Sequence, residues 1–579
     1  MSRRIGNWAR QCVLRAKQIP ALRRLLKAPL AAPLLATATK WFPPADQHYE
    51  NWIAARLHKR RDEYAHATEP GLLSLITPVW NTPPEYLRAL ASSVLQQSGD
   101  QPFEWVVLDN GTTRPETLEV LRNVLARDPR VRLFHSETNQ GIVAGMRFCL
   151  QQATGRYIVA VDHDDRLDED CLKIVTHHIQ RHNYPPLLFS DEDHICGQNR
   201  LLPYFKPDWD PVLFLNSAYT AHLGVMDRRL ALELDVYGDS DTNSCPDWDA
   251  FLRFYLAGHV PVHIPEILYS WRMHAGSTSA NMHSKNDVSA SHRAMLTRYL
   301  HSRDDADHHE IIRSPLFSGT PDWWIRRRHV DPRPLLLVVT TADQHRPPAL
   351  SAAVTGDYPC EKTIAIPRAA DPAILQDRIA NVAAANGLVA FVDDTLTIDG
   401  DEWAWEVLGL IERHPDIGMV GGRILDLRQR VMSAGFYRGC GKGLACPDVG
   451  RRVDDPGYFH QMWKQRTVDA VSPRFCVFAA GFLSELIRDT QQPPMTLDEL
   501  GAAAATHAAR TQRRVVYSPF LSATTPKSHA VGMPSSFEQQ LPPGESRYYS
   551  AALDRDVSRA YQPAVVENDE AEIYAEGEV

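Results

Sequence analysis

The stretch VAVDHDDRLDED, residues 159–170, joins a short apolar run to a dense group of carboxylates. The run ends at Val161, and Asp162, Asp164 and Asp165 follow almost at once. Carboxylates this close repel one another and raise one another's pKa values unless a positive charge lies among them. A divalent cation is the first candidate for that charge. The stretch therefore predicts a buried strand with a cation-binding site at its carboxyl end.

The composition is that of an ordinary globular protein. A chain of 579 residues is too long for one hydrophobic core, so two or three domains are expected. The net charge of -9 lacks the basic excess that a nucleic-acid-binding protein needs, and we expect no nucleic-acid partner. The nine cysteines have no spacing typical of a zinc site or a redox motif, which predicts reduced thiols in a cytoplasmic protein.

The two ends of the chain differ in charge from the middle. Residues 1–45 hold nine Lys or Arg and no acid, and we assign residues 1–70 to a basic helical N-terminal extension. This extension is either an amphipathic helix on the anionic inner membrane surface or a solvated helix that packs on the main domain. Its one apolar run is too short for a spanning helix. Residues 531–579 are assigned to an acidic, solubilising C-terminal tail.

Between residues 71 and 325, short apolar runs alternate with amphipathic segments, which predicts an α/β domain with a mostly parallel sheet. The expected strands are 72–79, 105–110, 131–136 and 156–162, and the expected helices are 83–97, 114–127 and 139–154. The acidic group therefore lies at the carboxyl end of the fourth strand. Open α/β sheets bind their ligands at that edge.

A second α/β unit is expected over residues 330–530, after a proline-rich break. Its expected strands are 335–341, 387–398, 417–425 and 514–519. The stretch VAFVDDTLTID, with Asp393 and Asp394, repeats the order of a strand followed by acids. This repetition indicates a degenerate internal duplication.

Four short motifs follow expected strands of the first unit: TPVWN at 77–81, LDNGTT at 108–113, NQGIVAG at 139–145 and VDHDD at 161–165. Each motif alone is typical of a turn or a helix cap. Their order and spacing together resemble the nucleotide-sugar half of the family 2 glycosyltransferases, which have the GT-A fold. The later motifs LLFSDED, PYFKPDWDP, CPDWDAFLR and IPEILYSWRMHAGSTS resemble the bacterial O-antigen and polysaccharide members of that family. The second unit resembles a degenerate GT-A-like domain.

The resemblance implies a set of residues that hold the nucleotide sugar. They are Thr77, Pro78, Asn81, Asp109, Asn139, Gly141, Asp162, Asp165 and Arg272. An ionised Asp109 would accept a hydrogen bond from the base or the ribose. Glycine at position 141 allows the backbone to approach the ligand closely. Arg272 would clamp phosphate oxygens.

The resemblance also implies a metal cofactor, Mg²⁺ or Mn²⁺. Asp162 and Asp164 match the DXD motif of the family, whose carboxylates hold the cation against the sugar diphosphate. His274 would approach the same cation. The alternative for this last segment is that Trp271 is a packing residue and His274 a surface residue.

The implied catalytic base is Asp247, in the motif CPDWDAFLR. It would take the proton of an acceptor hydroxyl, whose oxygen attacks the anomeric carbon from the face opposite the diphosphate and inverts the configuration. Asp249 is the competing candidate. Asp247 could also serve only as a residue of the helix start, since Pro246 precedes it.

The remaining motifs have less definite roles. Asp191, Glu192, Asp193 and Lys206 lie in the SDED and FKPDW motifs and are expected near the sugar or the acceptor. The second unit keeps Asp393 and Asp394 but lacks the nucleotide-holding turns and a clear acid-x-acid helix start. It is therefore expected to position the acceptor or mediate assembly, with a second active site as the alternative.

The resemblance implies an inverting, metal-dependent glycosyltransferase in the cytoplasm, peripheral on the inner membrane. Its donor would be a nucleotide sugar, and its acceptor a surface polysaccharide or a lipid-linked oligosaccharide. One rival is a non-catalytic carbohydrate-binding or scaffolding subunit of a polysaccharide assembly complex. A second rival, a nucleotidyltransferase, would need a glycine-rich basic loop near the first strand, and TPVWNTPPEYL contains none.

Overall fold

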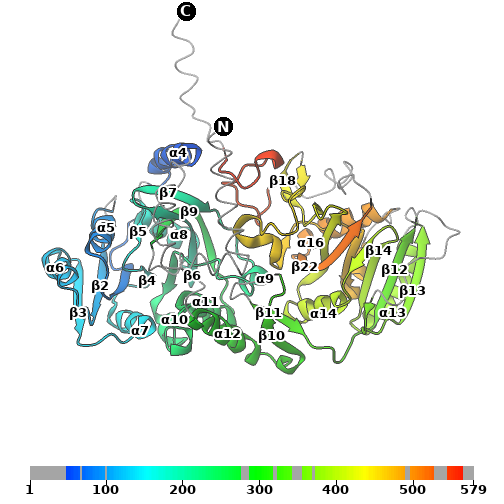
Figure 1. Ribbon diagram of the computed structural model, residues 1–579, viewed down its shortest axis with the longest axis horizontal. Coiled ribbons are helices and arrows are strands. Elements are labelled where there is room, and N and C mark those ends of the chain that lie inside the picture. The colour runs from blue at the N-terminus through cyan, green and yellow to red at the C-terminus, as the bar shows by residue number, and fades with distance from the viewer. Residues whose placement is uncertain are drawn as a thin grey trace, which may run out of the picture.

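The structure is a computed structural model. It describes residues 47–64, 68–97, 101–274, 286–316, 323–341, 355–367, 372–441, 443–489, 496–526 and 544–564. The predictions for residues 1–46 and for the acidic residues 565–579 lie outside this range. Two α/β domains lie side by side along the long axis of the molecule (Figure 1).

The first domain is built on one mixed sheet. Its strands are β1 (Leu73–Val79), β2 (Phe103–Asn110), β3 (Val131–Ser136), β4 (Tyr157–Ala160), β5 (Arg166–Leu167), β6 (Leu187–Cys196), β7 (Asn199–Tyr204), β8 (Gly224–Asp227) and β9 (Val262–Arg272). The order is β3-β2-β1-β4-β8-β6-β9-β5, and β7 pairs with β6. The first four strands are parallel to one another, as predicted. The first antiparallel pair along this order is β4 with β8.

Helices cover this sheet. They are α5 (Pro84–Leu95), α6 (Pro115–Asn123), α7 (Ile142–Gln152), α8 (Cys171–Arg181), α9 (Pro211–Phe214), α10 (Arg228–Glu233), α11 (Pro246–Leu256) and α12 (Asn286–His301). Prolines open α5, α6, α9 and α11, where the missing N–H costs no hydrogen bond. The hairpin of β10 (His309–Arg313) and β11 (Trp323–Arg327) leads to the second domain.

The second domain holds another nine-stranded sheet. Its strands are β12 (Leu335–Thr341), β13 (Lys362–Pro367), β14 (Leu388–Asp393), β15 (Thr397–Asp399), β16 (Ile417–Asp426), β17 (Val431–Ser433), β20 (Arg466–Val468), β21 (Phe475–Ala479) and β22 (Arg514–Thr525). A separate ribbon pairs β18 (Tyr437–Cys440) with β19 (Gly443–Ala445). The helices are α13 (Gln376–Ala384), α14 (Trp403–Arg413), α15 (Ala480–Asp489) and α16 (Leu497–Arg510). The α/β prediction is confirmed for both domains.

The second sheet repeats the topology of the first. Its order, β13-β12-β14-β21-β16-β22-β15 with β17 on β16, matches β2-β1-β4-β8-β6-β9-β5 with β7 on β6. The direction of each pair also matches: β14 and β21 are antiparallel like β4 and β8, and β16 and β22 are parallel like β6 and β9. Among the described residues, β3 has no counterpart. The order of chain elements therefore supports an internal duplication.

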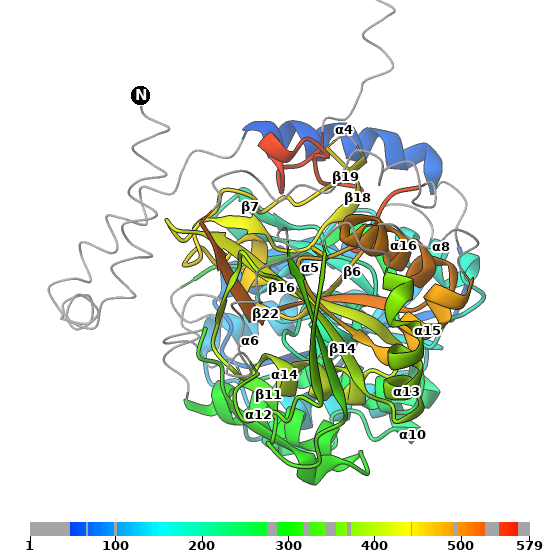
Figure 2. The same cartoon turned by 90° about the vertical axis from the view of Figure 1, so that its right-hand side faces the viewer.

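Two segments outside the sheets, residues 47–63 and 544–564, lie along the same side of the molecule (Figure 2). Helix α4 (Gln47–Glu63) packs on the first domain, where its Trp52 meets Phe205 edge-on at 4.8 Å. Residues 544–564, which the prediction assigns to the acidic tail, pack on the second domain through the buried Tyr549 and Leu553. No described helix is long and apolar enough to cross a bilayer.

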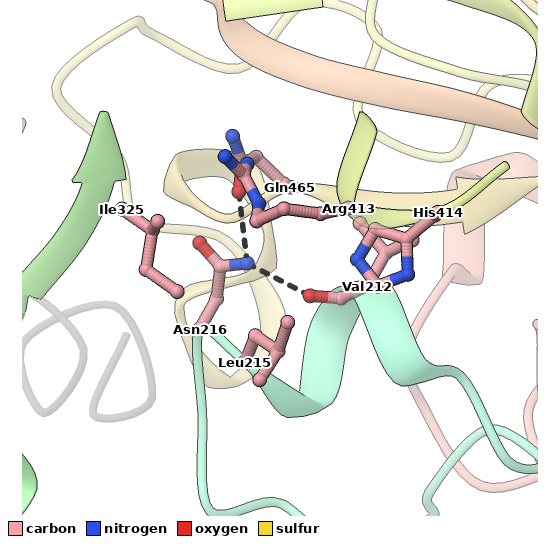
Figure 3. Close-up of a pocket in the computed structure, with 7 residues that line it drawn as sticks. All are labelled: Val212, Leu215, Asn216, Ile325, Arg413, His414 and Gln465. Atoms are coloured by element: carbon pink, nitrogen blue, oxygen red, sulfur yellow. Dashed lines mark hydrogen bonds between the residues drawn. The ribbon is translucent and has the colours of Figure 1, made fainter. Parts of the chain in front are cut away.

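The domains meet through polar and aromatic contacts. Asp210 accepts hydrogen bonds from the backbone N–H and the hydroxyl of Thr467, both at 2.7 Å. Beside this contact is a narrow pocket where Asn216 donates to Gln465 at 3.0 Å, close to Arg413 (Figure 3). The pocket is too narrow for a water molecule, and it lies in the domain interface. It is therefore part of the interface packing.

Candidate active site

Parallel strands bring the predicted motifs to one edge of the first sheet. In the β1–β2 register Pro78 lies opposite Leu108, and in the β1–β4 register Ile76 lies opposite Ala160. The loops that follow β1, β2 and β4 therefore leave the sheet at the same level. This edge is where a doubly wound sheet binds ligands.

The first two loops are tied together by side chains. Asn81 accepts the backbone N–H of Thr113 at 2.9 Å, across the two loops. Asp109 is almost fully buried; one of its oxygens accepts the N–H of Thr112 at 2.9 Å, and the other lies 2.9 Å from Nδ1 of His135. Asp109 thus has one oxygen fixed in a turn, and its other oxygen faces the largely exposed His135.

The next loop caps a helix. Asn139 is exposed, and its side-chain oxygen accepts the N–H of Gly141 at 2.9 Å. Gly141 precedes α7 and has a φ of 87°. A residue with a Cβ adopts this backbone conformation only with strain. Thr77 and Pro78 lie within β1 rather than in a loop. The side chain of Thr77 is buried and accepts the indole N–H of Trp105 at 3.0 Å. Any contact of Thr77 with a ligand would therefore use its backbone.

The two acids of the DXD motif are partly exposed and point to different partners. Oδ2 of Asp164 lies 2.8 Å from Nε2 of His274. Oδ2 of Asp162 lies 4.0 Å from Nε2 of His222. Carboxylate oxygens suit Mg²⁺ or Mn²⁺, and a cation would have to draw the two carboxylates together.

The pKa values of the two acids move in opposite directions. Burial, and then the negative charges of Asp247 and Asp164, outweigh His222 and raise the pKa of Asp162 to about 6. Burial also opposes ionisation of Asp164, but the hydrogen bond from His274 and the charge of His163 lower its pKa on balance. A cation beside Asp162 would favour its ionised form.

Arg272 and Asp165 lie behind the DXD acids. The guanidinium of Arg272 donates to the carbonyl oxygen of Asp164 at 2.5 Å and stacks 4.7 Å from the ring centre of Tyr86. Asp165 is buried and accepts the hydroxyl of Tyr269 at 2.6 Å and the backbone N–H of Arg272 at 2.7 Å. The two bonds let Asp165 hold β9 against the loop that carries Asp162 and Asp164.

The structure separates the two candidates for the catalytic base. Asp249 is buried, and its two oxygens accept from Arg253 at 2.7 Å and from Arg298 at 2.9 Å. Asp247, two residues earlier in α11, is partly exposed, and its Oδ2 lies 3.6 Å from Nδ1 of His222. The geometry favours Asp247, because its carboxylate lies beside His222, which also faces the DXD acid Asp162.

His222 is a residue of the site that the sequence analysis did not identify. It lies in the loop before β8, and its ring nitrogens face Asp247 on one side and Asp162 on the other. Burial opposes its charging, yet Asp247 and then Asp162 raise the pKa of His222 above its ordinary value. No motif spacing marks this position, since the contacts join segments far apart in the chain.

The SDED and FKPDW residues form buried pairs next to the site. Asp191 accepts the backbone N–H of Lys206 at 2.8 Å, and Asp193 accepts the hydroxyl of Tyr49 at 2.6 Å. Lys206 is fully buried, and its ammonium nitrogen lies 3.6 Å from Glu192. These charges therefore stabilise the wall behind the site.

One compact group of three possible metal ligands lies elsewhere among the described residues. Donor atoms of Asp305, His309 and Glu412 lie within 4.8 Å of one another. Arg303 already pairs with Asp305 at 2.7 Å, and Arg327 pairs with Glu412 at 2.7 Å. Because both carboxylates are neutralised, the group is best described as an ion-pair network near the domain boundary.

The match to a known protein family falls on the part of the chain that forms this edge of the sheet. Residues 74–201 match the family model for glycosyl transferase family 2. The uncharacterized protein y4gI of Sinorhizobium fredii is 27% identical over 69% of this chain and 47% of its own length. The O-antigen biosynthesis protein RfbC of Myxococcus xanthus is 26% identical over 80% of this chain and 38% of its own length.

A solved structure is also similar. The S. aureus TarS 1–349 structure in complex with UDP-GlcNAc is 20% identical, with a TM-score of 0.34 over 40% of this chain and 67% of that chain. The chain spans less than half of the length of y4gI and of RfbC. The matched residues 74–201 contain the nucleotide-side loops and the DXD acids described above. This part of the chain, residues 74–201, matches glycosyl transferase family 2.

Proposed function

We propose that the protein is an inverting glycosyltransferase that moves a sugar from a nucleotide-sugar donor to a surface polysaccharide or a lipid-linked oligosaccharide. One observation carries the proposal. The DXD acid Asp162 and the base candidate Asp247, 85 positions apart in the numbering, face each other across His222 at the carboxyl edge of the sheet. Donor and acceptor could therefore meet at this point.

Asp247 is the proposed general base. It lies in the first turn of α11, its side chain is 20% exposed, and its ion pair with His222 is a long one of 3.6 Å. It takes the proton of the acceptor hydroxyl while that oxygen bonds to the anomeric carbon and the bond to the diphosphate breaks. Attack from the opposite face inverts the configuration.

Asp162 and Asp164, with His274, are the residues that would hold Mg²⁺ or Mn²⁺. The bound cation would neutralise the charge that builds on the leaving nucleoside diphosphate. Arg272, fixed against Tyr86 and the Asp164 carbonyl, would bind phosphate oxygens beside it. The expected loops for the nucleotide are those of Asn81, Asp109 and Asn139.

The test is turnover of a panel of nucleotide sugars with Mg²⁺ or Mn²⁺, read as release of nucleoside diphosphate. Asp164→Asn should abolish metal-dependent turnover and leave the thermal unfolding midpoint unchanged, because Asp164 is partly exposed. Full activity of this variant would refute the metal assignment. Calorimetric titration of nucleoside diphosphates with and without Mn²⁺ separates the enzyme from a non-catalytic scaffold.

We also propose that the second domain is not catalytic. Asp393 is buried and accepts the backbone N–H of Thr395 at 2.9 Å, so its carboxylate is part of a turn. At the start of α16, the Thr496 hydroxyl accepts the backbone N–H of Glu499 at 3.2 Å and donates to its carboxylate at 3.0 Å, so Glu499 is engaged by the helix cap. Transfer should survive Asp394→Ala and disappear with Asp164→Ala; the reverse result would place the active site in the second domain.

Contact with the inner membrane, from the cytoplasmic side, is proposed for residues 1–45 alone. Their nine cations and no acid support attraction to anionic lipid. Sedimentation with vesicles of phosphatidylglycerol and phosphatidylethanolamine tests this, with vesicles of phosphatidylcholine as control. Binding that persists without residues 1–45 would contradict it.

A further inference from the structure

His222 occupies the space between the two halves of the site. Its Nδ1 lies 3.6 Å from Oδ2 of Asp247, and its Nε2 lies 4.0 Å from Oδ2 of Asp162. Asp162 belongs to the loop after β4 and Asp247 to the start of α11. The imidazole is thus the described side chain that bridges the donor side and the base.

The backbone of His222 is fixed by a buried ion pair. Its N–H donates to Oε2 of Glu192 at 2.5 Å, and its carbonyl accepts from the ammonium group of Lys206 at 2.6 Å. Lys206 is fully buried, with an accessible surface of 0%. Glu192 and Lys206 lie 3.6 Å apart, so each holds the other in place.

The ring of His222 is fixed as well. It lies 4.9 Å from the ring centre of Tyr269 and 5.5 Å, edge to face, from that of Trp271. Tyr269 is itself held by its hydrogen bond to Asp165. With its backbone and both sides of the ring constrained, His222 presents its two nitrogens in set directions.

We propose that His222 is a positioning residue that orients the carboxylate of Asp247 toward the acceptor hydroxyl. The inference rests on the proposed function of the site. The distance of 3.6 Å is longer than a hydrogen bond, and catalytic hydrogen bonds are often long before substrate binds and shorten in the substrate complex. With Oδ2 held by Nδ1 of His222, Oδ1 is the oxygen left for the acceptor.

The two ring nitrogens permit a matched test. The amide nitrogen of asparagine stands close to the position of Nδ1, and that of glutamine close to the position of Nε2. His222→Asn therefore keeps a donor for Asp247, and His222→Gln keeps one only toward Asp162. If His222 acts through Asp247, asparagine should restore activity and glutamine should not.

The expected results are specific. His222→Ala and His222→Gln should lower kcat by about 10- to 100-fold, as expected when a reacting group is misplaced by about 1 Å. His222→Asn should keep most of the kcat. The donor KM and the affinity for nucleoside diphosphate with Mn²⁺ should stay unchanged in all three variants, because the effect passes through the base. His259→Asn, beyond the far end of α11, is the control and should match the wild type.

Two results would overturn the proposal. The first is equal loss of kcat in the asparagine and glutamine variants. The second is a loss of Mn²⁺-dependent nucleotide affinity with kcat preserved, which would mean that His222 acts through Asp162. Crystal structures of the wild type and His222→Ala give a readout independent of activity: the Asp247 carboxylate should rotate, and an unchanged rotamer would contradict the proposal. Failure of the proposed function itself is distinct, since the wild type would then release no nucleoside diphosphate.

Discussion

Asp247 and Asp249 stand two positions apart on α11 and have opposite surroundings. Asp249 is 1% exposed and lies between Arg253 and Arg298, whereas the side chain of Asp247 is 20% exposed and faces His222. A carboxylate between two guanidiniums is a stabilising element, and both of its oxygens are already engaged. The surroundings therefore favour Asp247 as the proposed base and a structural role for Asp249.

Asparagine substitutions at these two positions should have opposite effects. Asp247→Asn should lower kcat by about 10²- to 10⁴-fold, the range for loss of a general base, with the same unfolding midpoint. Asp249→Asn should remove the buried counter-charge shared by Arg253 and Arg298, which keep Asp235 and Asp239 as partners, and cost about 1–3 kcal/mol of stability. Nucleotide release and thermal unfolding of both variants check this. Loss of transfer in a still-folded Asp249→Asn would make Asp249 the better base candidate.

His263 gives a pH dependence of stability. Its Nε2 lies 2.8 Å from Asp191 and its Nδ1 3.1 Å from Asp208. Burial opposes its charging, but Asp191 and then Asp208 raise the pKa of His263 to about 9. A raised pKa in the folded state means that the stabilisation is complete below the unfolded value of about 6.5 and is lost as the pH rises toward 9.

The stability difference between the wild type and His263→Asn should therefore shrink between pH 6.5 and 9. The slope should be at most about 1.4 kcal/mol per pH unit, the linkage of one proton. Thermal midpoints of both proteins at four pH values measure this. A difference that stays constant across the range would show that His263 is not charged in the folded protein.

At the scale of single elements, α4 shows how a basic helix can serve a structural purpose. Arg60 is buried and forms an ion pair with Asp168. It also pairs with Asp170, whose Oδ2 lies 3.2 Å from its Nε. Arg56 pairs with Glu266, a buried residue of β9. These cations face the protein, so for residues 47–64 the structure agrees with a helix that packs on the main domain. The membrane alternative concerns only residues 1–46.

Arg60→Met should destabilise the first domain. It leaves Asp168 and Asp170 buried with fewer counter-charges, which costs about 3–5 kcal/mol when one member of a buried pair is removed. Lys59→Met, at an exposed position of the same helix, is the matched control and should change little. Urea unfolding of the two variants gives the comparison. Equal midpoints would mean that α4 does not contribute to the stability of the domain.

At the scale of the whole molecule, the second domain supports the wall of the first site. Phe459 stacks on Tyr204 with ring centres 3.8 Å apart, and the hydroxyl of Tyr458 accepts the N–H of Phe205 at 2.8 Å. Lys206, which holds the carbonyl of His222, lies 5.8 Å from the ring centre of Tyr204. A packed series of contacts thus joins the duplicated domain to the proposed active site.

Removal of the Phe459 ring should affect both stability and turnover. Phe459→Ala should lose about 0.5–1.5 kcal/mol from the aromatic pair, besides its buried area. It should also lower kcat, because Tyr204 and Lys206 lose their support. Phe459→Tyr keeps the ring and serves as control. If the thermal midpoint fell but kcat did not change, the contact with the second domain would contribute to stability and not to turnover.

Much of the architecture follows from local sequence. The apolar run LLLVVTT forms β12 with the predicted bounds. The runs predicted to begin at residues 72, 105 and 131 form β1, β2 and β3. Strand and helix periodicity depend on neighbours within a few positions, so one chain segment contains the signal. The DXD acids were predicted for the same reason, since strand and acids are contiguous.

The sequence by itself determined the two α/β units, the strand-end motifs and the candidates Asp162, Asp164 and Asp247. Only the tertiary structure decided that Asp249 accepts a hydrogen bond from Arg298 and that Asp193 accepts one from Tyr49 of α4. It also placed His222 between the two halves of the site. These outcomes depend on contacts between side chains far apart in the sequence, from 25 positions for His222 and Asp247 to 144 positions for Asp193 and Tyr49. Such contacts follow from the packing of the sheet and its helices, and no local pattern carries them.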